Sequence, residues 1–265
     1  MRRVQHGVAL ITALLVVAIA VTAAIGMSVR DHAQIHRSGL VFEQDLARSL
    51  LLGAEVMALR LLERWPNLND LPWDGCISPP VPLVIDDIDL IARVENLHCR
   101  FNLNSLARPD DPPVAAFADL VARAGRESNI AAWQGEQLAA AVRDWMDTET
   151  DDPVYRLRSP PERSGNRPFL LASELNRVQG MTPEIWAAIA PYVTARPGTD
   201  NLIDLERAAD IVREAVAAQP EEAQELHYFR LSLVARLPER DFFHCAVLDA
   251  LNGRTVVREF TPCED

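Results

Sequence analysis

The sequence predicts an α+β protein with a long N-terminal helix, a small antiparallel sheet and a large all-helical insertion. Three observations support this fold class. Apolar side chains recur at helical spacing toward residue 65, alternating apolar and polar residues predict strands on both sides of the chain's middle, and that middle shows helical periodicity over about 110 residues. Strands, then helices, then strands indicate a helical unit inserted into a small α+β domain.

An uncharged apolar run begins the chain. No side chain from Val8 to Val29 is charged, and the run is 22 residues long. At about 1.5 Å of rise per residue, a helix of this length matches the roughly 30 Å hydrocarbon core of a bilayer. Arg2 and Arg3 precede the run, so the positive-inside tendency keeps the short N-terminus in the cytoplasm and exports the rest.

The run has three interpretations. It can be a cleaved secretory signal with small-residue sites at 18–20 or 22–24, but such a signal needs only about 7–15 apolar residues. It can be a plain uncleaved anchor. The third interpretation, which we favour, is a leader of residues 1–7 that ends at Gly7. Basic residues, a glycine and an immediate apolar stretch resemble the processing site of type IV pilins and pseudopilins, where the prepilin peptidase would cut between Gly7 and Val8 and methylate Val8.

The helix is expected to continue beyond the membrane. Residues 8–29 form its transmembrane half, and residues 30–65 form an amphipathic half that packs on its own domain. Apolar side chains of that half recur at helical spacing, at Ala47, Leu50, Leu51, Ala54, Met57, Ala58, Leu61 and Leu62. Pro66 ends the helix, and residues 67–82 have the composition of a loop.

Strands are predicted on both sides of the helical middle. Residues 86–104 alternate apolar and polar side chains. Near the C-terminus, Phe229, Leu231, Leu233, Ala235 and Leu237 would share one face of a strand. The next two apolar segments flank Asn252-Gly253, which predicts a hairpin with a type I′ turn because both residues accept positive φ.

The helical middle divides the chain into domains. We predict a pseudopilin-like α+β domain from residues 66–109 and 218–265, and an inserted helical domain at 110–217. The insertion should contain helices at 114–124, 130–146, 173–178, 183–193 and 205–217. Residues 175–189 resemble a helix-hairpin-helix unit in which Gly180 forms the turn and Thr182 caps the second helix. Such units often bind DNA, but the acidic surroundings favour a packing role.

Composition excludes several classes of function. The net charge is −12, and all 26 basic residues are arginine, so nucleic acid is not expected as a partner. No Ser-His-Asp order, phosphate loop or H-E-x-x-H motif appears, so we do not expect an enzyme. The six histidines are scattered, and His98 and His244 are expected to be core or surface residues rather than metal ligands.

The four cysteines are disulfide candidates. Their even number in an exported chain favours disulfides over zinc, which the spacing does not support. Four thiols allow three pairings, and the spacing does not choose among them. The candidates are Cys76, Cys99, Cys245 and Cys263.

Four segments, in order, resemble the type II secretion system protein K (GspK) family of minor pseudopilins. They are HGVALITALLVVAIA at the N-terminus, RFNLNSL at 100–106, VRDWMDTETD at 142–151 and NRPFLLASELNRVQGMTPEIWAAIAPYVTARPG at 166–198. The resemblance covers nearly the whole chain. It implies a subunit at the tip of the type II secretion pseudopilus that nucleates or caps assembly for protein secretion. The alternative is a membrane-anchored periplasmic module that recognises secreted cargo without entering a filament.

The resemblance also implies location and partners. The protein would cross the inner membrane once, with most of the chain in the periplasm. Its partners would be GspI-like and GspJ-like minor pseudopilins, the major pseudopilin and the prepilin peptidase. Thr12, the fifth residue after the Gly7 cut, stands where most pilins have Glu, whose carboxylate would pair with the subunit above. A neutral residue suits a subunit with nothing above it, because an unpaired charge in hydrocarbon is costly.

The chain departs from the family pattern in two places. The loop after the DWxD element is compressed to DTETDDPVY, and NLIDLERAAD at 201–210 replaces a different family stretch. The first departure affects a candidate calcium site, because the acidic residues there could supply oxygen ligands. A solvated acidic turn is the simpler interpretation, so no cofactor is required and calcium is an optional ligand. The candidate ligands are Asp144, Asp147, Asp151 and Asp152.

Overall fold

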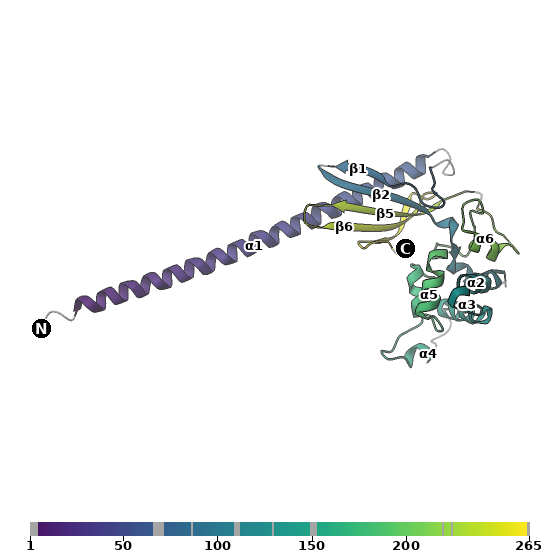
Figure 1. The fold of residues 1–265 in the computed structure, drawn as a ribbon, viewed down its shortest axis with the longest axis horizontal. Helices are drawn as coiled ribbons and strands as arrows, with labels where there is room; N and C mark the ends of the chain where they lie inside the picture. The colour runs from purple at the N-terminus through teal and green to yellow at the C-terminus, as the bar shows by residue number, and fades with distance from the viewer. Residues whose placement is uncertain are drawn as a thin grey trace. The chain divides into compact units, whose positions relative to one another are not determined.

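The structure is a computed structural model that describes residues 5–65, 72–85, 87–108, 112–128, 130–148, 153–218, 220–223 and 225–263. The chain divides into two compact units, residues 1–50 and 51–265. Helix α1 (Gln5–Arg64) supplies most of the first unit, and its last turns belong to the second. Figure 1 shows α1 followed by the strands and the shorter helices. The predicted α+β class is confirmed, including the long helix and the small antiparallel sheet.

The main sheet has five antiparallel strands in the order β1-β2-β5-β6-β7. The last turns of α1 pack on one face of this sheet, and we call the opposite face the outer face. Alternation along β5 places Phe229, Leu231, Leu233 and Ala235 toward α1, all at most 1% exposed, as the sequence predicts. The strands are β1 (Val81–Ile85), β2 (Ile88–Asn96), β5 (Tyr228–Arg236), β6 (Asp241–Asp249) and β7 (Arg254–Glu259).

Strand β1 begins in the last two residues of the segment predicted to be a loop. Its five residues pair in register with β2, from Val81 with Ala92 to Ile85 with Ile88. Pro82 argues against a strand in the sequence, because proline has no N–H to donate to a neighbouring strand. An edge strand tolerates proline, since alternate backbone groups of an edge strand have no partner strand to bond. The predicted loop is therefore wrong at residues 81 and 82, which belong to β1.

The hairpin between β6 and β7 is confirmed, but its predicted turn type is wrong. Asp249 pairs with Arg254, so the loop has four residues rather than two. A type I′ turn requires positive φ at both central residues. Gly253 has a φ of 61°, whereas the φ of Asn252 is not positive. Asn252 instead donates through its backbone N and its side-chain amide to the Asp249 carboxylate. This side-chain bonding stabilises the longer loop, which the dipeptide alone does not reveal.

The segment between β2 and β5 is mainly helical and includes a short sheet. Strands β3 (Phe101–Asn102) and β4 (Val193–Thr194) pair in parallel. The insertion therefore contains a strand that helical periodicity did not predict, because two residues carry no periodic signal. Its α-helices are α2 (Pro112–Ala124), α3 (Ala132–Met146), α4 (Pro153–Arg156), α5 (Pro183–Ile189) and α6 (Asp210–Val216). Phe101, Phe117, Leu120, Leu138 and Ile189 are at the centre of its apolar core, none more than 1% exposed.

Three predicted helices differ in kind or length. Residues 172–177 form a 3₁₀ helix rather than an α-helix, and α6 begins at Asp210 rather than at 205. Helix α5 ends at Ile189 rather than at 193, because residues 190–192 form a 3₁₀ helix and Val193 begins β4. The helix-hairpin-helix-like segment keeps its predicted turn and cap. Gly180 has a φ of 86°, and Thr182 accepts a hydrogen bond from the backbone N of Ile185 over 3.3 Å.

Candidate functional site

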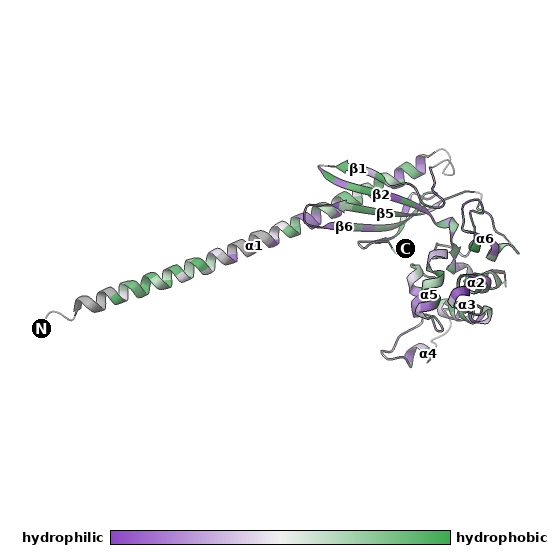
Figure 2. Cartoon of the chain, viewed as in Figure 1, coloured by the Kyte–Doolittle hydropathy of each residue, from purple (hydrophilic) through white to green (hydrophobic). Residues whose placement is uncertain are grey.

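The apolar part of α1 is the first candidate functional element. Residues Ile11–Ser28 form a helix long and apolar enough to cross a membrane, with a mean hydropathy of 2.3 and no burial within the described protein. Figure 2 shows this run as a green stretch of α1. Thr22 satisfies its hydroxyl inside the helix by donating to the Ile19 carbonyl over 2.9 Å. A polar side chain bonded in this way is compatible with a lipid environment.

The predicted processing and anchor residues lie on this same helix. Gly7 and Val8 fall within α1, which begins at Gln5, and Thr12 follows one turn later. The structure thus places the three residues in one helical segment. Cleavage and methylation remain predictions.

The second half of α1 buries some of its apolar side chains and exposes others. Leu51, Ala54 and Leu62 are buried, each at most 5% exposed. Met57 and Leu61 belong to the predicted stripe but are 42% and 54% exposed, respectively. Figure 2 shows the mixed character of this part of the helix. The helix therefore buries one stripe and leaves Val56, Met57 and Leu61 exposed.

A buried carboxylate attaches α1 to the sheet. Glu55 accepts hydrogen bonds from His244 Nε2 and Thr255 Oγ1, each over 2.6 Å. Arg258 donates to both oxygens of Glu55, through Nε over 2.8 Å and Nη2 over 2.5 Å. Glu55 is 1% exposed. The charged and neutral donors on both oxygens offset the cost of burying this carboxylate.

Burial and hydrogen bonding oppose each other at this cluster. Burial raises the pKa of Glu55, but hydrogen bonds from Arg258, Thr255 and His244 outweigh it and hold that pKa below its usual value. Burial lowers the pKa of His244 despite its bond to Glu55. Glu55 is therefore ionised and His244 neutral at neutral pH. The arrangement is that of a structural clamp, with a carboxylate already saturated by donors.

The RFNLNSL segment supplies two asparagines that join β3 to the β4 segment. Asn102 accepts from the backbone N of Arg196 over 3.0 Å and donates to the carbonyl of Asp200 over 2.8 Å. Asn104 donates to the carbonyls of Phe169 and Arg196, over 3.0 and 2.8 Å, and accepts from the Phe169 backbone N over 2.8 Å. Both asparagines are at most 1% exposed. Their amides replace the backbone partners that these irregular segments lack.

Residues 201–210, where the chain departs from the family pattern, belong to the same hydrogen-bond network. Asn201 accepts a bond from the backbone N of Asn102 over 2.9 Å. Asp204 accepts from the Asn96 amide over 2.8 Å. These two residues attach the segment to the end of β2 and to β3.

A fully buried arginine lies beside a buried histidine. Arg196 Nη1 is 2.7 Å from His98 Nδ1, and Arg196 Nη2 donates to the Leu202 carbonyl over 2.9 Å. Burial lowers the pKa of Arg196 to about 10 and, together with the Arg196 charge, the pKa of His98 to about 2. At neutral pH the pair therefore carries one positive charge. His98 and His244 are both core residues, as the sequence analysis expects.

The structure pairs the four cysteines in sequence order. Cys76 bonds to Cys99, and Cys245 bonds to Cys263. The first bond fixes the segment before β1 to the end of β2. The second fixes the C-terminal segment to β6. The fold brings the two members of each pair close together, and so selects one of the three pairings that the sequence allowed.

The candidate calcium ligands are only partly described. Asp144 lies in α3, and Asp147 follows its last residue. Asp151 and Asp152 lie outside the described residues. Within the described part of the chain, no three His, Cys, Asp or Glu side chains are grouped so that they could hold a metal ion. Calcium binding stays a prediction, which a calcium-dependent rise in melting temperature would support.

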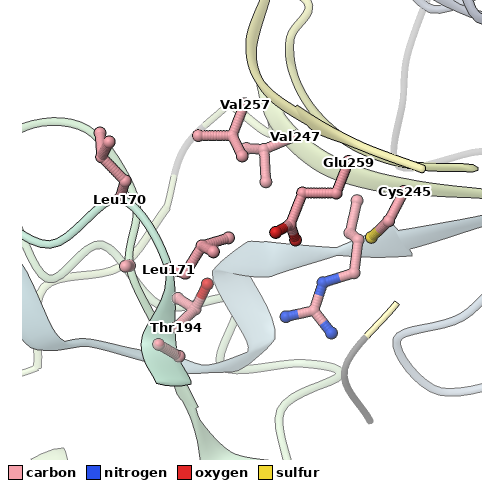
Figure 3. A pocket seen from close by; sticks show the side chains of 10 residues that line it. Leu170, Leu171, Thr194, Cys245, Val247, Val257 and Glu259 are labelled. Carbon is pink, nitrogen blue, oxygen red and sulfur yellow. The ribbon is translucent and has the colours of Figure 1, made fainter. Parts of the chain in front are cut away.

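A small cavity lies where the sheet meets the helical segment. Figure 3 shows Val247, Val257 and Glu259 on one side, with Leu170, Leu171 and Thr194 facing them. Its volume is about 30 Å³, enough for one or two water molecules. A substrate would not fit, so this cavity does not indicate an enzyme.

Several residues that connect distant parts of the fold were not predicted from the sequence. Glu55 lies among the predicted apolar positions of the amphipathic half-helix, and Asn102, Asn104 and Arg196 lie in family-like segments, but none of them was expected to form these bonds. An uncompensated acidic residue on the sheet-facing side of an amphipathic helix is a signal that could have identified Glu55. Its partners lie about 190 or more residues away along the chain, as the separations of 189 to 203 show.

Comparison with known proteins is consistent with these features. Residues 99–198 match a family model described as "Type II secretion system (T2SS), protein K". A type II secretion system protein K from Aeromonas hydrophila is 30% identical over 227 residues, which cover 77% of this chain and 67% of the relative. The Pseudomonas aeruginosa protein of that name is 32% identical over 219 residues, covering 74% and 64%. The chain thus spans about two thirds of the length of these curated relatives.

A solved structure has the same fold. It is described as the GspK-GspI-GspJ complex from the enterotoxigenic Escherichia coli type 2 secretion system. One of its chains superposes with a TM-score of 0.66 at 19% identity, covering 88% of this chain and all of that one.

Proposed function

Because this chain belongs to the type II secretion system protein K family, we propose that it is a minor pseudopilin at the tip of the secretion pseudopilus. There it would nucleate or cap assembly for the export of folded proteins across the outer membrane. Its role would be structural rather than catalytic. It would cross the inner membrane once and hold most of its chain in the periplasm.

The observation that carries this proposal is the character of α1. The exposed apolar span and the segment packed on the sheet are parts of a single 60-residue helix. An apolar surface of this length cannot remain in water, so lipid or neighbouring helices must cover it. Pseudopilin assembly supplies both, first in the membrane and then in the filament.

Two features favour the tip over the shaft. Thr12 supplies no carboxylate for a subunit above to neutralise. The helical segment between β2 and β5 enlarges the globular part, and a bulky part is more easily placed once at an end than repeated along a filament. We therefore propose one copy per pseudopilus.

The partners would be two smaller minor pseudopilins, GspI-like and GspJ-like, with the major pseudopilin below them. We assign to them the part of α1 that exposes the apolar side chains of Val56, Met57 and Leu61. Exposed apolar side chains on a helix suit helix-to-helix packing with subunits of the same architecture.

Intact mass of the membrane-extracted protein tests the proposal. We expect a chain that begins at Val8, carries one added methyl group and contains two disulfides. A mature N-terminus near residue 20 or 24 would contradict it, and an uncut Gly7 would favour the membrane-anchored cargo-binding module. A second experiment is co-expression with the two partners, which should give a 1:1:1 complex. Homopolymeric filaments of this chain would exclude the tip role.

Met57→Glu should weaken that complex. Glu136→Gln, a substitution at an exposed position on α3, should leave the complex unchanged.

A further inference from the structure

A groove on the outer face of the main sheet lies on the side away from α1. Its floor comes from β2, β5 and β6, and its volume is about 240 Å³. We call it the Arg groove because Arg93, Arg100 and Arg230 line it. That volume admits a few side chains of a peptide segment but not a folded domain.

Each side wall of the Arg groove is held by a disulfide. Ile77 forms one wall, next to Cys76, which bonds to Cys99. Pro262 and Cys263 form another, and Cys263 bonds to Cys245 on β6. Backbone bonds add to the first wall, because Asn96 N donates to the Cys76 carbonyl over 2.7 Å. The groove is therefore built from covalently fixed segments, which reduces the entropy that a ligand must overcome.

The charge of the Arg groove is opposite to that of the chain. Its lining contains three arginines and one acidic residue, Glu95, a net charge of +2 in a protein of net charge −12. Arg100 Nε lies 2.6 Å from one Glu95 oxygen, and Arg230 Nη1 lies 3.3 Å from the other. These ion pairs hold two guanidinium groups in place, with side chains 13% exposed. Arg93 is exposed beside them.

The remainder of the lining is apolar. Ile77, Val234, Phe243 and Pro262 surround the arginines, and Ser232 adds a hydroxyl. A small inorganic anion gains nothing from apolar walls. A peptide that presents a carboxylate beside an aliphatic side chain would use both parts of the lining, since arginine pairs with carboxylates in a fixed geometry.

We propose that the Arg groove binds an acidic peptide segment of a partner protein, with a Glu or Asp carboxylate at the arginines and an adjacent apolar side chain against Val234 and Phe243. This inference goes beyond the proposed assembly through α1, which lies on the opposite face of the sheet. Peptide binding at the Arg groove can be refuted while the tip role stands, and the tip role can be refuted while peptide binding stands.

Fluorescence anisotropy on the full chain in detergent tests it. The probe is a labelled Gly-Leu-Glu-Glu-Val-Gly peptide, and the matched peptide replaces both glutamates with glutamine. The two peptides have the same apolar residues but differ in charge, so the anisotropy of each peptide in detergent without protein is subtracted. We expect saturable binding of the glutamate peptide that weakens as salt rises, and at least tenfold weaker binding of the glutamine peptide. Equal binding of the two, or no binding at millimolar peptide, would overturn the proposal.

Two substitutions locate the site. Arg93→Glu should weaken binding about tenfold without affecting folding, because Arg93 is exposed. Arg126→Glu makes the same charge change at an exposed position far along the chain and should alter binding less than twofold. Equal effects of the two would indicate a response to net charge and would refute the groove. Inorganic phosphate that displaces the peptide at the peptide's own concentration would assign the site to a small anion instead.

The wall at Cys263 provides a separate test. A Cys245→Ser, Cys263→Ser double variant releases this wall and keeps the Cys76–Cys99 bond. If the variant remains folded by circular dichroism, it should bind the glutamate peptide several times more weakly. Unchanged binding by the folded variant would contradict the assigned wall. If the variant does not fold, the comparison of Arg93→Glu with Arg126→Glu decides the outcome.

Discussion

His244 on β6 donates a hydrogen bond through Nε2 to the Glu55 carboxylate on α1 over 2.6 Å, with side chains 0% and 2% exposed. The two residues are separated by 189 positions. Arg258 and Thr255 of β7 complete the clamp from the adjacent strand. The end of α1 is therefore held by polar bonds as well as by apolar packing, and those bonds define its register on the sheet.

Glu55→Gln should destabilise the globular unit. An amide offers one acceptor oxygen in place of two, so some of the buried donors lose their partner, and each such loss costs about 1–3 kcal/mol. We expect the free energy of unfolding to fall by about 2–4 kcal/mol, measured by urea titration with tryptophan fluorescence. Glu136→Gln on α3 is exposed and should change it by less than about 0.5 kcal/mol. Equal effects of the two variants would refute the clamp.

Acid should weaken the same clamp. The pKa of Glu55 is lowered in the folded state, so its contribution is complete above the unfolded pKa of about 4.3 and is lost as the pH falls through the folded pKa. The stability difference between the wild type and Glu55→Gln should therefore shrink from pH 7 to pH 3. A difference that stays constant over this range would show that the Glu55 charge does not contribute.

Burial of His98 should make the protein less stable already in mild acid, at a higher pH than the loss at Glu55. The pKa of His98 is lowered to about 2 by burial and by Arg196, whereas an unfolded histidine titrates near 6.5. Protons then bind the unfolded chain preferentially, so stability declines as the pH falls below about 6.5. Unfolding measured at pH 7, 6 and 5 should show this decline in the wild type and in Glu55→Gln alike. Stability that is flat between pH 7 and 5 would contradict it.

Asn104→Asp should destabilise more than its size suggests. Aspartate cannot donate to the carbonyls of Phe169 and Arg196, and its charge would face both oxygens. We expect a loss of about 3 kcal/mol or more in the free energy of unfolding. Gln137→Glu makes the same change from amide to carboxylate at an exposed position on α3 and should be nearly neutral. Comparable melting temperatures for the two variants would rule out the bridging role of Asn104.

Thr12→Glu should impair the proposed tip function. The substitution places a carboxylate in the apolar span, at a cost of about 2.5–3.5 kcal/mol when nothing pairs with it. We expect reduced secretion of cargo in cells at equal protein levels, whereas Thr12→Ser should secrete normally. Full secretion by Thr12→Glu would remove the physical argument for a neutral residue at the tip, and the family assignment would be unaffected.

Elements with a local pattern could be predicted from the sequence. The apolar run gave the span of α1, alternation along residues 229–237 gave the face of β5, and Thr182 gave the start of α5. Such patterns succeed because burial repeats with the period of the element. They failed at β1, where Pro82 hides the strand, and at Asn252, where a side-chain bond to Asp249 lengthens the turn.

Contacts between residues far apart in the sequence could not be predicted and are known only from the folded structure. It paired Cys245 with Cys263, surrounded Glu55 with donors from β6 and β7, and brought three arginines to one groove. These contacts depend on strand order and register, which arise from packing of the whole chain and leave no periodic trace near any one residue. Periodicity therefore predicted many of the buried apolar side chains, whereas the fold alone determined which residues those side chains contact.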